Sequence, residues 1–521
     1  MKKLRPMISL ALALIGTPIL SLSSAETPKQ AQGSVHPAHK TATKGPNVIF
    51  ILADDLGTGN LGCYGADNFK TPQIDALAQS GTRFERCYTS PLCGPSRALL
   101  LTGRYAFRTG MTSNDSGPLV KPENETLIPK LLKSAGYATA MAGKWSQLTL
   151  QPSDWGFDEY LRFKSSGQYW NYQPKAKTFT LNGNDVPLLD KEYLPDKMQE
   201  FVVSFINKHK DEQFFVYYPL SHVHEDILPT PDSIPGSTTL YRDNVEYMDK
   251  LVGKLVAEID RLKLRDNTLI IFAGDNGTTH TQHVQSTIGG WQLSGWKGTM
   301  LEGGALVPCI ASWPGQIPAG VVSTNLIDFS DMLPTIAEIA GAKIPEGLTI
   351  DGKSFAAPLR GAGDLWPRSW IFVELGRHWF GRSAGWKLDE IGQLFEMKDA
   401  PFAEPLVPAE AKDEAATAAR QELQRVLGEL NPAGGIVDTG DGSGSHSKAG
   451  KDPAKKKEKK ARRKAIAEGK DPTSVDGDAA GPGENSASRP LKGNSGSEKS
   501  DMNAETQATP TDSQNANEPG E

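Results

Sequence analysis

The run NVIFILADD, at residues 47–55, constrains the fold of this chain more than any other segment. It is apolar almost without a break and rich in β-branched residues, which is the pattern of a strand buried on both faces. Such strands occur in parallel sheets that are covered by helices on both sides. This one segment therefore predicts an α/β domain.

Helix and strand patterns alternate after this run. The segment TPQIDALAQSG is typical of a helix, with Pro72 suited to the first turn and Gly81 suited to the stop. The segments 127–145 and 245–277 each repeat the order of a helix pattern followed by an apolar strand pattern. We therefore expect a mostly parallel sheet sandwiched by helices.

The first 25 residues are typical of a signal peptide. A basic head precedes an apolar stretch at 7–22, and small residues end at Ala25. A membrane anchor is the alternative, but the stretch is short for a bilayer and is interrupted by Pro18. No later stretch of the sequence has the length and apolarity of a membrane span. We expect an exported protein, periplasmic or extracellular, with no stable membrane insertion after the signal is cleaved.

The rest of the sequence divides into four parts. Residues 26–45 are expected to form a linker, 46–345 the main domain, 346–430 a small antiparallel α+β subdomain, and 431–521 a disordered tail. The tail is nearly free of large apolar residues, so burial cannot offset its ordering entropy. Its basic run at 455–470 is a solvated charge run or, alternatively, a polyanion-binding arm. The formal net charge of −6 gives no case for a nucleic-acid partner.

The four cysteines are too few for a disulfide scaffold. Cys309 lies in the apolar run LVPCIASW, which predicts a core thiol. Cys63 and Cys87 could pair with each other, and the sequence leaves this open. Cys93 stands directly before Gly-Pro-Ser-Arg and an apolar run, so it needs an explanation of its own.

Two apolar strand patterns run straight into polar residues that can bind a cation. The first ends in Asp54 and Asp55, and the second ends in Asp275 and Asn276. Ligands of a parallel sheet gather outside the carboxyl ends of its strands. Carboxylate and amide oxygens suit a hard divalent cation such as Ca²⁺ or Mg²⁺. Either strand end alone is a common turn signal, but the two together favour a metal site.

The position of Cys93 relative to a predicted helix suggests anion chemistry. Pro95 is suited to a helix start, so Cys93 precedes a helix N-terminus, where unpaired N–H groups favour an anion. Arg97 lies four residues on and could bind the same anion as a forked donor. A thiolate nucleophile is one interpretation. Cysteine phosphatases, however, place arginine six residues after the cysteine, and position 99 here is Leu99.

The segment CGPSRALLLTGR resembles the signature of the type I sulfatases, members of the alkaline phosphatase-like superfamily. Further motifs similar to those of the family stand on either side of it, with NVIFILADDLG before it and GKW, AGDNG and KGTMLEGG after it, and the resemblance covers Asn47 to Leu406. It implies a large α/β domain with a smaller C-terminal subdomain. It also implies that a formylglycine-generating enzyme oxidises Cys93 to formylglycine, whose hydrate attacks the sulfur of a sulfate ester.

The resemblance implies a role for each matching residue. Lys144 and Lys297 would bind the sulfate group, Arg97 would hold the aldehyde hydrate, and His224 would donate a proton to the leaving group. His222 is the nearby competitor for that last role. The implied ligands of one Ca²⁺ ion, with Mg²⁺ as the alternative, are Asp54, Asp55, Cys93, Asp275 and Asn276.

The sequence departs from the family pattern in two places. Many sulfatases have a histidine after GKW that drives sulfate release, whereas this chain has Ser146 in that place. Some sulfatase-like sequences carry a glutamine near this point, to which Gln147 is comparable. Neither can act as a general base at neutral pH, so we hypothesise that His280, His283 or water takes that role. In the second place, EGGALVP lacks an arginine that is common after the glycines.

The substrate implied by the resemblance is a sulfated small molecule or glycan. Aromatic residues concentrate at 155–172, where they could stack on sugars or pack a loop against the domain. Two rival functions remain open at this point. One is a phosphate or phosphonate ester hydrolase of the same superfold, and the other is a non-catalytic binder of sulfated glycans.

Overall fold

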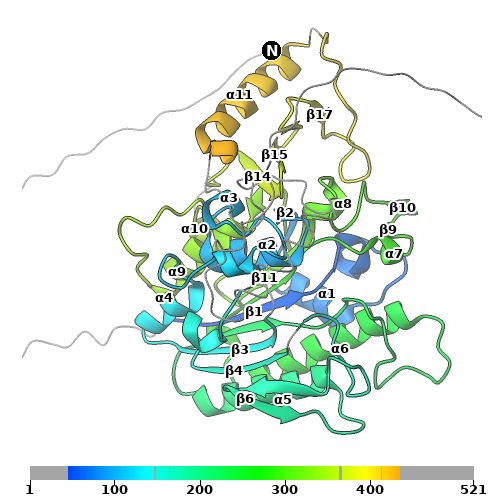
Figure 1. Cartoon of the computed structure of the whole chain (residues 1–521), viewed down its shortest axis with the longest axis vertical. Coiled ribbons are helices and arrows are strands. Elements are labelled where there is room, and N and C mark those ends of the chain that lie inside the picture. The colour runs from blue at the N-terminus through cyan, green and yellow to red at the C-terminus, as the bar shows by residue number, and fades with distance from the viewer. Residues whose placement is uncertain (1–44, 146–147, 164, 363–365, 412, 435–521) are drawn as a thin grey trace, which may run out of the picture. The chain divides into compact units, whose positions relative to one another are not determined.

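The computed structural model describes residues 45–434 apart from 146–147, 164, 363–365 and 412, and its largest element is an 11-stranded sheet (Figure 1). The strands of this sheet are β1 (Asn47–Ala53), β2 (Thr82–Tyr88), β3 (Ala138–Lys144), β4 (Glu159–Phe163), β5 (Thr178–Leu181), β6 (Asn184–Pro187), β7 (Phe214–Pro219), β8 (Thr268–Gly274), β11 (Leu306–Ser312), β12 (Val321–Ser323) and β13 (Ile327–Asp328). The predictions for the signal peptide, for most of the linker and for the tail beyond residue 434 lie outside the described residues.

The centre of the sheet is parallel, as expected. The strand order is β12, β2, β11, β8, β1, β7, β3, β4, β5 and β6, and β13 pairs with β2. The five consecutive strands β8, β1, β7, β3 and β4 all run parallel to one another. Strand β11 is antiparallel to both β8 and β2, and β5 and β6 add an antiparallel edge. The prediction of a mostly parallel sheet is therefore confirmed.

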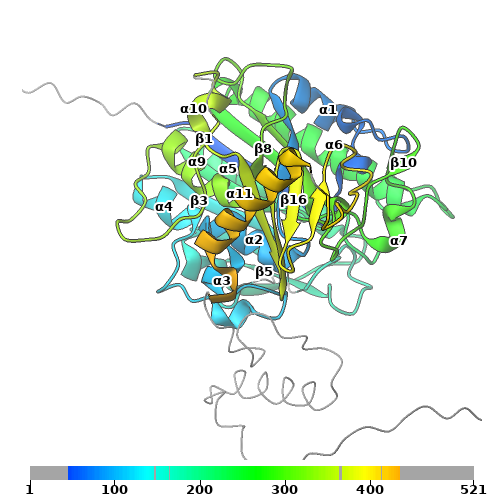
Figure 2. The ribbon, with the colours of Figure 1, turned by 90° about the horizontal axis from the view of Figure 1, so that it is seen from above.

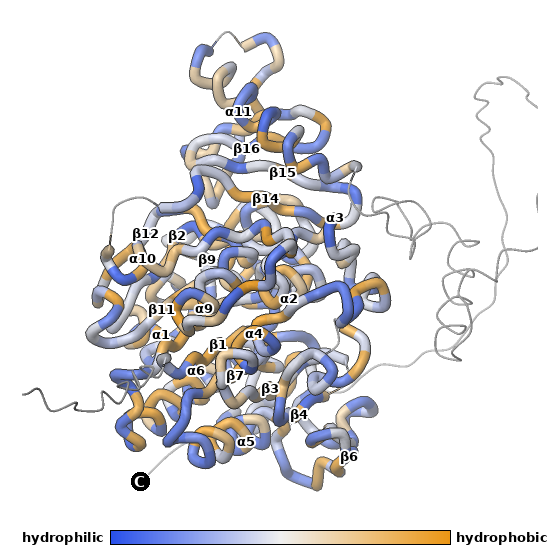
Figure 3. Tube along the Cα trace, turned by 90° about the vertical axis from the view of Figure 1, so that its left-hand side faces the viewer, coloured by the Kyte–Doolittle hydropathy of each residue, from blue (hydrophilic) through white to orange (hydrophobic). Residues whose placement is uncertain are grey.

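Helices cover both faces of the sheet, which explains why β1 is apolar throughout. Residues of β1 from Val48 to Leu52 alternate between two separate hydrophobic cores, one on each face. The helices of the first core are α2 (Cys93–Thr102), α4 (Ile128–Ser134) and α9 (Met332–Ala340), and those of the second are α1 (Pro72–Gln79), α5 (Leu194–His209) and α6 (Leu240–Arg261). Figure 2 shows α4 and α9 on one side of the strands and α1 and α6 on the other, and Figure 3 colours the region around β1 and β11 as apolar.

A second, four-stranded antiparallel sheet follows the main domain. Its strands are β14 (Trp370–Leu375), β15 (His378–Ser383), β16 (Trp386–Asp389) and β17 (Leu394–Glu396). Helix α11 (Glu414–Leu430) lies across this sheet, where Leu423 joins Leu388 and Leu394 in a small core (Figure 2). The small antiparallel subdomain is confirmed, while the exact boundary after residue 345 stays a prediction.

The remaining elements are short. They are α3 (Ala106–Thr109), α7 (His280–His283), α8 (Glu302–Ala305), α10 (Ala356–Leu359) and the hairpin of β9 (Thr287–Ile288) and β10 (Trp291–Gln292). Within the part of the chain that the structure describes, no helix has both the length and the apolarity needed to cross a membrane.

Buried ion pairs join the small sheet to the main domain. Arg368, just before β14, pairs with Asp328 at 3.0 Å and with Asp331, and all three side chains are fully buried. Arg382 of β15 donates to Glu302 of α8 at 3.1 Å. Breaking a buried pair leaves an uncompensated charge, so these contacts fix the small sheet against the main domain.

All four cysteines are free, so the pairing of Cys63 with Cys87 that the sequence left open does not form. The two residues have different neighbours: the N–H of Cys63 donates to Asp75 at 2.7 Å, and the thiol of Cys87 contacts that of Cys309. Cys309 is buried in β11 and is the core thiol that the sequence predicted.

Candidate active site and metal centre

The two strand ends that carry acidic residues lie side by side. Because β1 and β8 are parallel neighbours with Ala53 opposite Gly274, the residues that follow them emerge at the same edge of the sheet. The N–H of Asp55 donates to Asp275 Oδ1 at 3.0 Å, and Asn276 Nδ2 donates to Asp55 Oδ1 at 2.8 Å. The expected meeting of these side chains at one sheet edge is therefore found.

Cys93 is the first residue of α2 and faces the same edge. Its Sγ lies 3.4 Å from Asp54 Oδ1 and 3.6 Å from Asp55 Oδ1. Helix α2 is buried along its whole length, which follows from its apolar sequence and holds the cysteine in a fixed position. Burial first, and Asp275 second, raise the pKa of the Cys93 thiol well above its usual value. A protonated thiol is a poor nucleophile, so the thiolate interpretation does not fit this setting.

Two cations from different elements neutralise the buried acids. Arg97, one helical turn after Cys93, donates through Nε and Nη2 to Asp275 Oδ2 at 2.9 and 2.7 Å. Lys144, the last residue of β3, donates to Asp54 Oδ1 and Oδ2 at 2.9 and 2.7 Å. Burial alone would raise the pKa of Asp54, but the nearby positive charges, that of Lys144 above all, lower it to about 2. The carboxylate is therefore ionised at any physiological pH.

Lys297 supplies a third cation at the site. Its Nζ lies 2.6 Å from Asp55 Oδ1 and 2.7 Å from Oδ2. Burial would lower the pKa of Lys297, but the carboxylates of Asp55 and Asp54 raise it, so the ammonium stays charged. The side chains of the centre are thus balanced, with three carboxylates facing three cations, namely Asp54, Asp55 and Asp275 against Arg97, Lys144 and Lys297.

The donor atoms fit a hard divalent cation. Ligand atoms of Asp54, Asp55, Cys93 and His224 all lie within 4.8 Å of one another. The amide oxygen of Asn276 is buried and makes no hydrogen bond within the described part of the chain, so it is free to coordinate. Asp275 is not in that group of four, but its side chain accepts hydrogen bonds from the N–H of Asp55 and from Arg97.

A cavity of about 200 Å³ opens over Cys93. Its lining residues are Cys93, Gly94, Arg97, Asn114, Lys144, Ser165, Ser166 and His224. Three of these, Asn114, Ser165 and Ser166, were missed by the sequence analysis, because they come from loops that carry no motif or periodicity. Asn114 Oδ1 accepts from the N–H of Gly94 at 2.8 Å, which holds the loop against the start of α2.

The geometry favours His224 over His222 as the histidine of the site. His224 lines the cavity, and its Nε2 lies 3.7 Å from Asp55 Oδ2. His222 is fully buried, its Nε2 bonds to the hydroxyl of Tyr193 at 2.9 Å, and burial lowers its pKa to about 3. His222 therefore stays neutral and acts as a packing residue.

The two groups offered as substitutes for the absent histidine are not at the cavity. The ring of His280 packs on Trp296 with a centroid distance of 4.4 Å, and that of His283 lies 5.9 Å from the same ring. Neither is among the described residues that line the cavity over Cys93. Ser146 and Gln147 lie outside the described residues, so the base for sulfate release stays a hypothesis.

Most of the aromatic residues at 155–172 pack inside the domain. Trp155, Tyr160, Phe163 and Tyr169 are buried. Only Tyr172, which stacks on Trp170, is largely exposed, at 59%. The interpretation of this segment as loop packing is therefore confirmed for its buried members.

Comparisons with known proteins agree with this geometry. The family model described as Sulfatase matches residues 46–342. Human arylsulfatase D is 30% identical over 449 residues, covering 68% of this chain and 74% of the relative. Human arylsulfatase A is 34% identical over 359 residues, covering 63% of this chain and 70% of the relative.

Solved structures show the same fold. The structure of Ps i-CgsB in complex with k-i-k-neocarrahexaose has a TM-score of 0.62 and 28% identity, and covers 74% of this chain and 93% of its own. The PsFucS1 sulfatase from Pseudoalteromonas sp. has a TM-score of 0.63 and 26% identity, and covers 75% of this chain and 90% of its own. A phosphonate monoester hydrolase from Silicibacter pomeroyi, at 19% identity and a TM-score of 0.54, shares the fold alone.

Proposed function

The chain belongs to the sulfatase family, and we propose that this sulfuric ester hydrolase acts on the sulfate esters of carbohydrates at the cavity over Cys93. The observation that carries the assignment of the site is the contact of Cys93 Sγ with Asp54 and Asp55, at 3.4 and 3.6 Å, beside the two buried cations Arg97 and Lys144 and the partly exposed Lys297. The choice of a carbohydrate is supported by Ps i-CgsB, whose structure holds a neocarrahexaose.

Each side chain has a role that follows from its charge and place. Lys144 lines the cavity and Lys297 pairs with Asp55 beside it, so both would bind the oxygens of an anionic sulfate group. His224, at the more exposed side, would donate a proton to the leaving oxygen. Arg97 would hold the group at position 93 and keep Asp275 in place.

The bound cation and the modified cysteine complete the site. When present, Ca²⁺ held by Asp54, Asp55, Asp275, Asn276 and the group at position 93 would act as a Lewis acid, and formylglycine derived from Cys93 would supply the nucleophile. The finer choice of Ca²⁺ over Mg²⁺ rests on the oxygen donors that the chain itself supplies, namely the carboxylates of Asp54 and Asp55 and the unbonded amide oxygen of Asn276, whereas Mg²⁺ usually keeps several waters. A formylglycine-generating enzyme is then a required partner, and export through the N-terminal signal is part of the same proposal.

The test combines chemistry at position 93 with substrate choice. The protein is produced together with a formylglycine-generating enzyme, and peptide mass spectrometry measures conversion of Cys93. Rates are then compared on 4-nitrophenyl sulfate, 4-nitrophenyl phosphate and a panel of sulfated oligosaccharides, with Cys93→Ala as the control. We expect the sulfate ester to be preferred and sulfate to be released from oligosaccharides. A preference for the phosphate ester, or release from aryl esters only, would contradict the proposal.

A further inference from the structure

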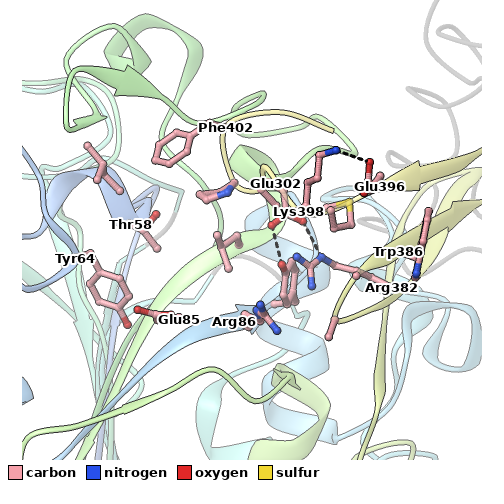
Figure 4. Close-up of a pocket in the computed structure, with 18 of the residues that line it drawn as sticks. Thr58, Tyr64, Glu85, Arg86, Glu302, Arg382, Trp386, Glu396, Lys398 and Phe402 are labelled. Carbon is pink, nitrogen blue, oxygen red and sulfur yellow. Dashed lines mark hydrogen bonds and ion pairs between the residues drawn. The ribbon is translucent and has the colours of Figure 1, made fainter. Parts of the chain in front are cut away.

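A second cavity, of about 490 Å³, lies between β2 and the small antiparallel sheet (Figure 4). Its walls come from β2, from the segment after β1 with β9, from the segment around α8, and from β15 to β17 with the residues that follow them, up to Phe402. None of its lining residues lines the cavity over Cys93. The volume is in the range of small-molecule sites, which is about 300–1,000 Å³.

A β-bulge turns a basic side chain of β2 toward this cavity. The pairing of β2 with β11 shifts between Val307 and Cys309, so that Glu85 and Arg86 both lie opposite Pro308. Proline has no N–H to give to the ladder, and a bulge re-aims the side chains that it carries. Both Glu85 and Arg86 consequently line the cavity.

The charges in the wall leave one cation over. Three ion pairs are formed within the lining, namely Arg83–Glu85 at 3.5 Å, Arg382–Glu302 at 3.1 Å and Lys398–Glu396 at 3.0 Å. Arg86 is half-buried, and its guanidinium has no hydrogen bond or ion pair with any residue that the structure describes. The cavity therefore presents a guanidinium whose charge is uncompensated, which matches a ligand with a single anionic group.

The rest of the wall suits a ring that carries hydroxyl groups. Trp386 and Phe402 face the cavity, and Phe402 is 37% exposed. The hydroxyl of Thr58, a buried lining residue, has no hydrogen-bond partner within the described residues. Figure 4 shows Thr58, Arg86, Trp386 and Phe402 on different sides of the cavity. A ligand that reaches all of them has both an apolar face and polar groups.

We propose that this cavity is a second saccharide-binding site, separate from the catalytic one, for a sugar that bears one sulfate or carboxylate group. The guanidinium of Arg86 binds the anionic group as a forked donor, and Trp386 and Phe402 pack against the ring. The choice of a sugar as the ligand rests on the function proposed above, whereas the charge requirement rests on the cavity itself.

The experiment is isothermal titration calorimetry on the full chain, with a sulfated tetrasaccharide as the probe and Cys93→Ala as the background that prevents turnover. We expect two bound molecules per chain in this background and one after the further change Arg86→Ala. Arg86→Lys keeps the charge but loses the fork, so it weakens the second site by about tenfold. Arg377→Ala is the matched control, since Arg377 is an exposed arginine that does not line the cavity.

The outcomes separate the two proposals. One molecule per chain with Cys93→Ala alone, and none after Arg86→Ala, would keep this site and reject glycan binding at the catalytic cavity. The same number and affinity of bound molecules with and without Arg86 would overturn the second site. Turnover of 4-nitrophenyl sulfate by Arg86→Ala, with Cys93 intact, is expected to equal that of the wild type.

Further titrations distinguish the chemistry of the ligand. A uronate disaccharide without sulfate is expected to occupy the Arg86 site, because its carboxylate matches the same fork. The desulfated tetrasaccharide, from a probe that contains no uronate, and inorganic sulfate are each expected to bind at least about tenfold more weakly than the sulfated probe. If the desulfated sugar binds as tightly as the sulfated probe, the charge is not recognised. If inorganic sulfate binds as tightly as the probe, the sugar is not recognised.

Discussion

Lys144 Nζ donates to both carboxylate oxygens of Asp54, at 2.9 and 2.7 Å, although the two residues are 90 positions apart and both are buried. The contact exists because β3 and β1 run in the same direction, separated only by β7. Their carboxyl ends therefore reach the same edge of the sheet, where one supplies a cation and the other an anion.

Lys144→Ala is expected to damage both stability and activity. The change leaves the ionised Asp54 without its nearest partner, and breaking a buried pair costs about 3–5 kcal/mol. Thermal unfolding and the kcat/KM for 4-nitrophenyl sulfate are measured for Lys144→Ala and Lys144→Arg. The arginine variant is expected to recover stability more than activity, and full activity in the alanine variant would exclude a role for Lys144 in binding sulfate.

Removal of the cation is expected to abolish turnover while leaving the chain folded. The three carboxylates of the centre already face three cations, so a chelator exposes no unpaired charge. Activity is titrated with Ca²⁺ and, separately, with Mg²⁺ after chelation. Asn276→Ala, which removes an oxygen donor, is expected to raise the Ca²⁺ concentration for half-activity on the order of tenfold. Activity that survives complete chelation would reject a metal at this site.

His224→Ala is expected to slow esters with poor leaving groups more than esters with good ones. Proton donation contributes about 10²- to 10⁴-fold where the leaving oxygen is basic, as in a sugar alcohol. The measurement compares kcat on a sulfated sugar and on 4-nitrophenyl sulfate. His222→Ala serves as the control, since His222 packs against Tyr193 and is expected to change the melting temperature instead. Equal losses on both substrates in His224→Ala would argue against proton donation.

Glu374 is expected to make stability fall as pH rises. Burial raises its pKa from 4.5 to about 8, with one oxygen accepting from the N–H of Phe107 at 2.9 Å. The folded chain thus holds a proton that the unfolded chain loses above pH 4.5. The resulting stability is complete below pH 4.5 and is lost as pH rises to about 8, at up to about 1.4 kcal/mol per pH unit.

The measurement for Glu374 is the melting temperature of the wild type and of Glu374→Gln across this pH range. The glutamine has no proton to lose, so the difference between the two proteins is expected to shift in favour of the variant as pH rises. Parallel curves would show that Glu374 does not titrate in this window.

Local patterns were sufficient to predict the sheet and the strand ends. The apolar runs before Asp54 and before Asp275 each predicted a buried strand that ends in acidic residues, whereas the pairing of these two strands with each other is known only from the sheet order. The start of α1 at Pro72 followed in the same way from the proline in its first turn.

Contacts between distant segments could not be predicted. Asn114 and Ser165 reach the cavity from loops whose path depends on packing of the whole domain. The contact of Cys87 with Cys309 depends on the order of β2 and β11 in the sheet, which no single-strand pattern contains. The unpaired charge of Arg86 likewise depends on the packing around β2, because no acidic side chain within the described residues lies close enough to pair with it.

The equal numbers of acids and cations around Cys93 have a consequence for the order in which the enzyme is built. Because these acids already have lysine and arginine partners, the chain does not need an ion to neutralise them as it folds. An ion that binds the folded chain would be the last component to enter. Only at that moment does the pocket acquire a surplus of positive charge, and with it an attraction for the negatively charged ester.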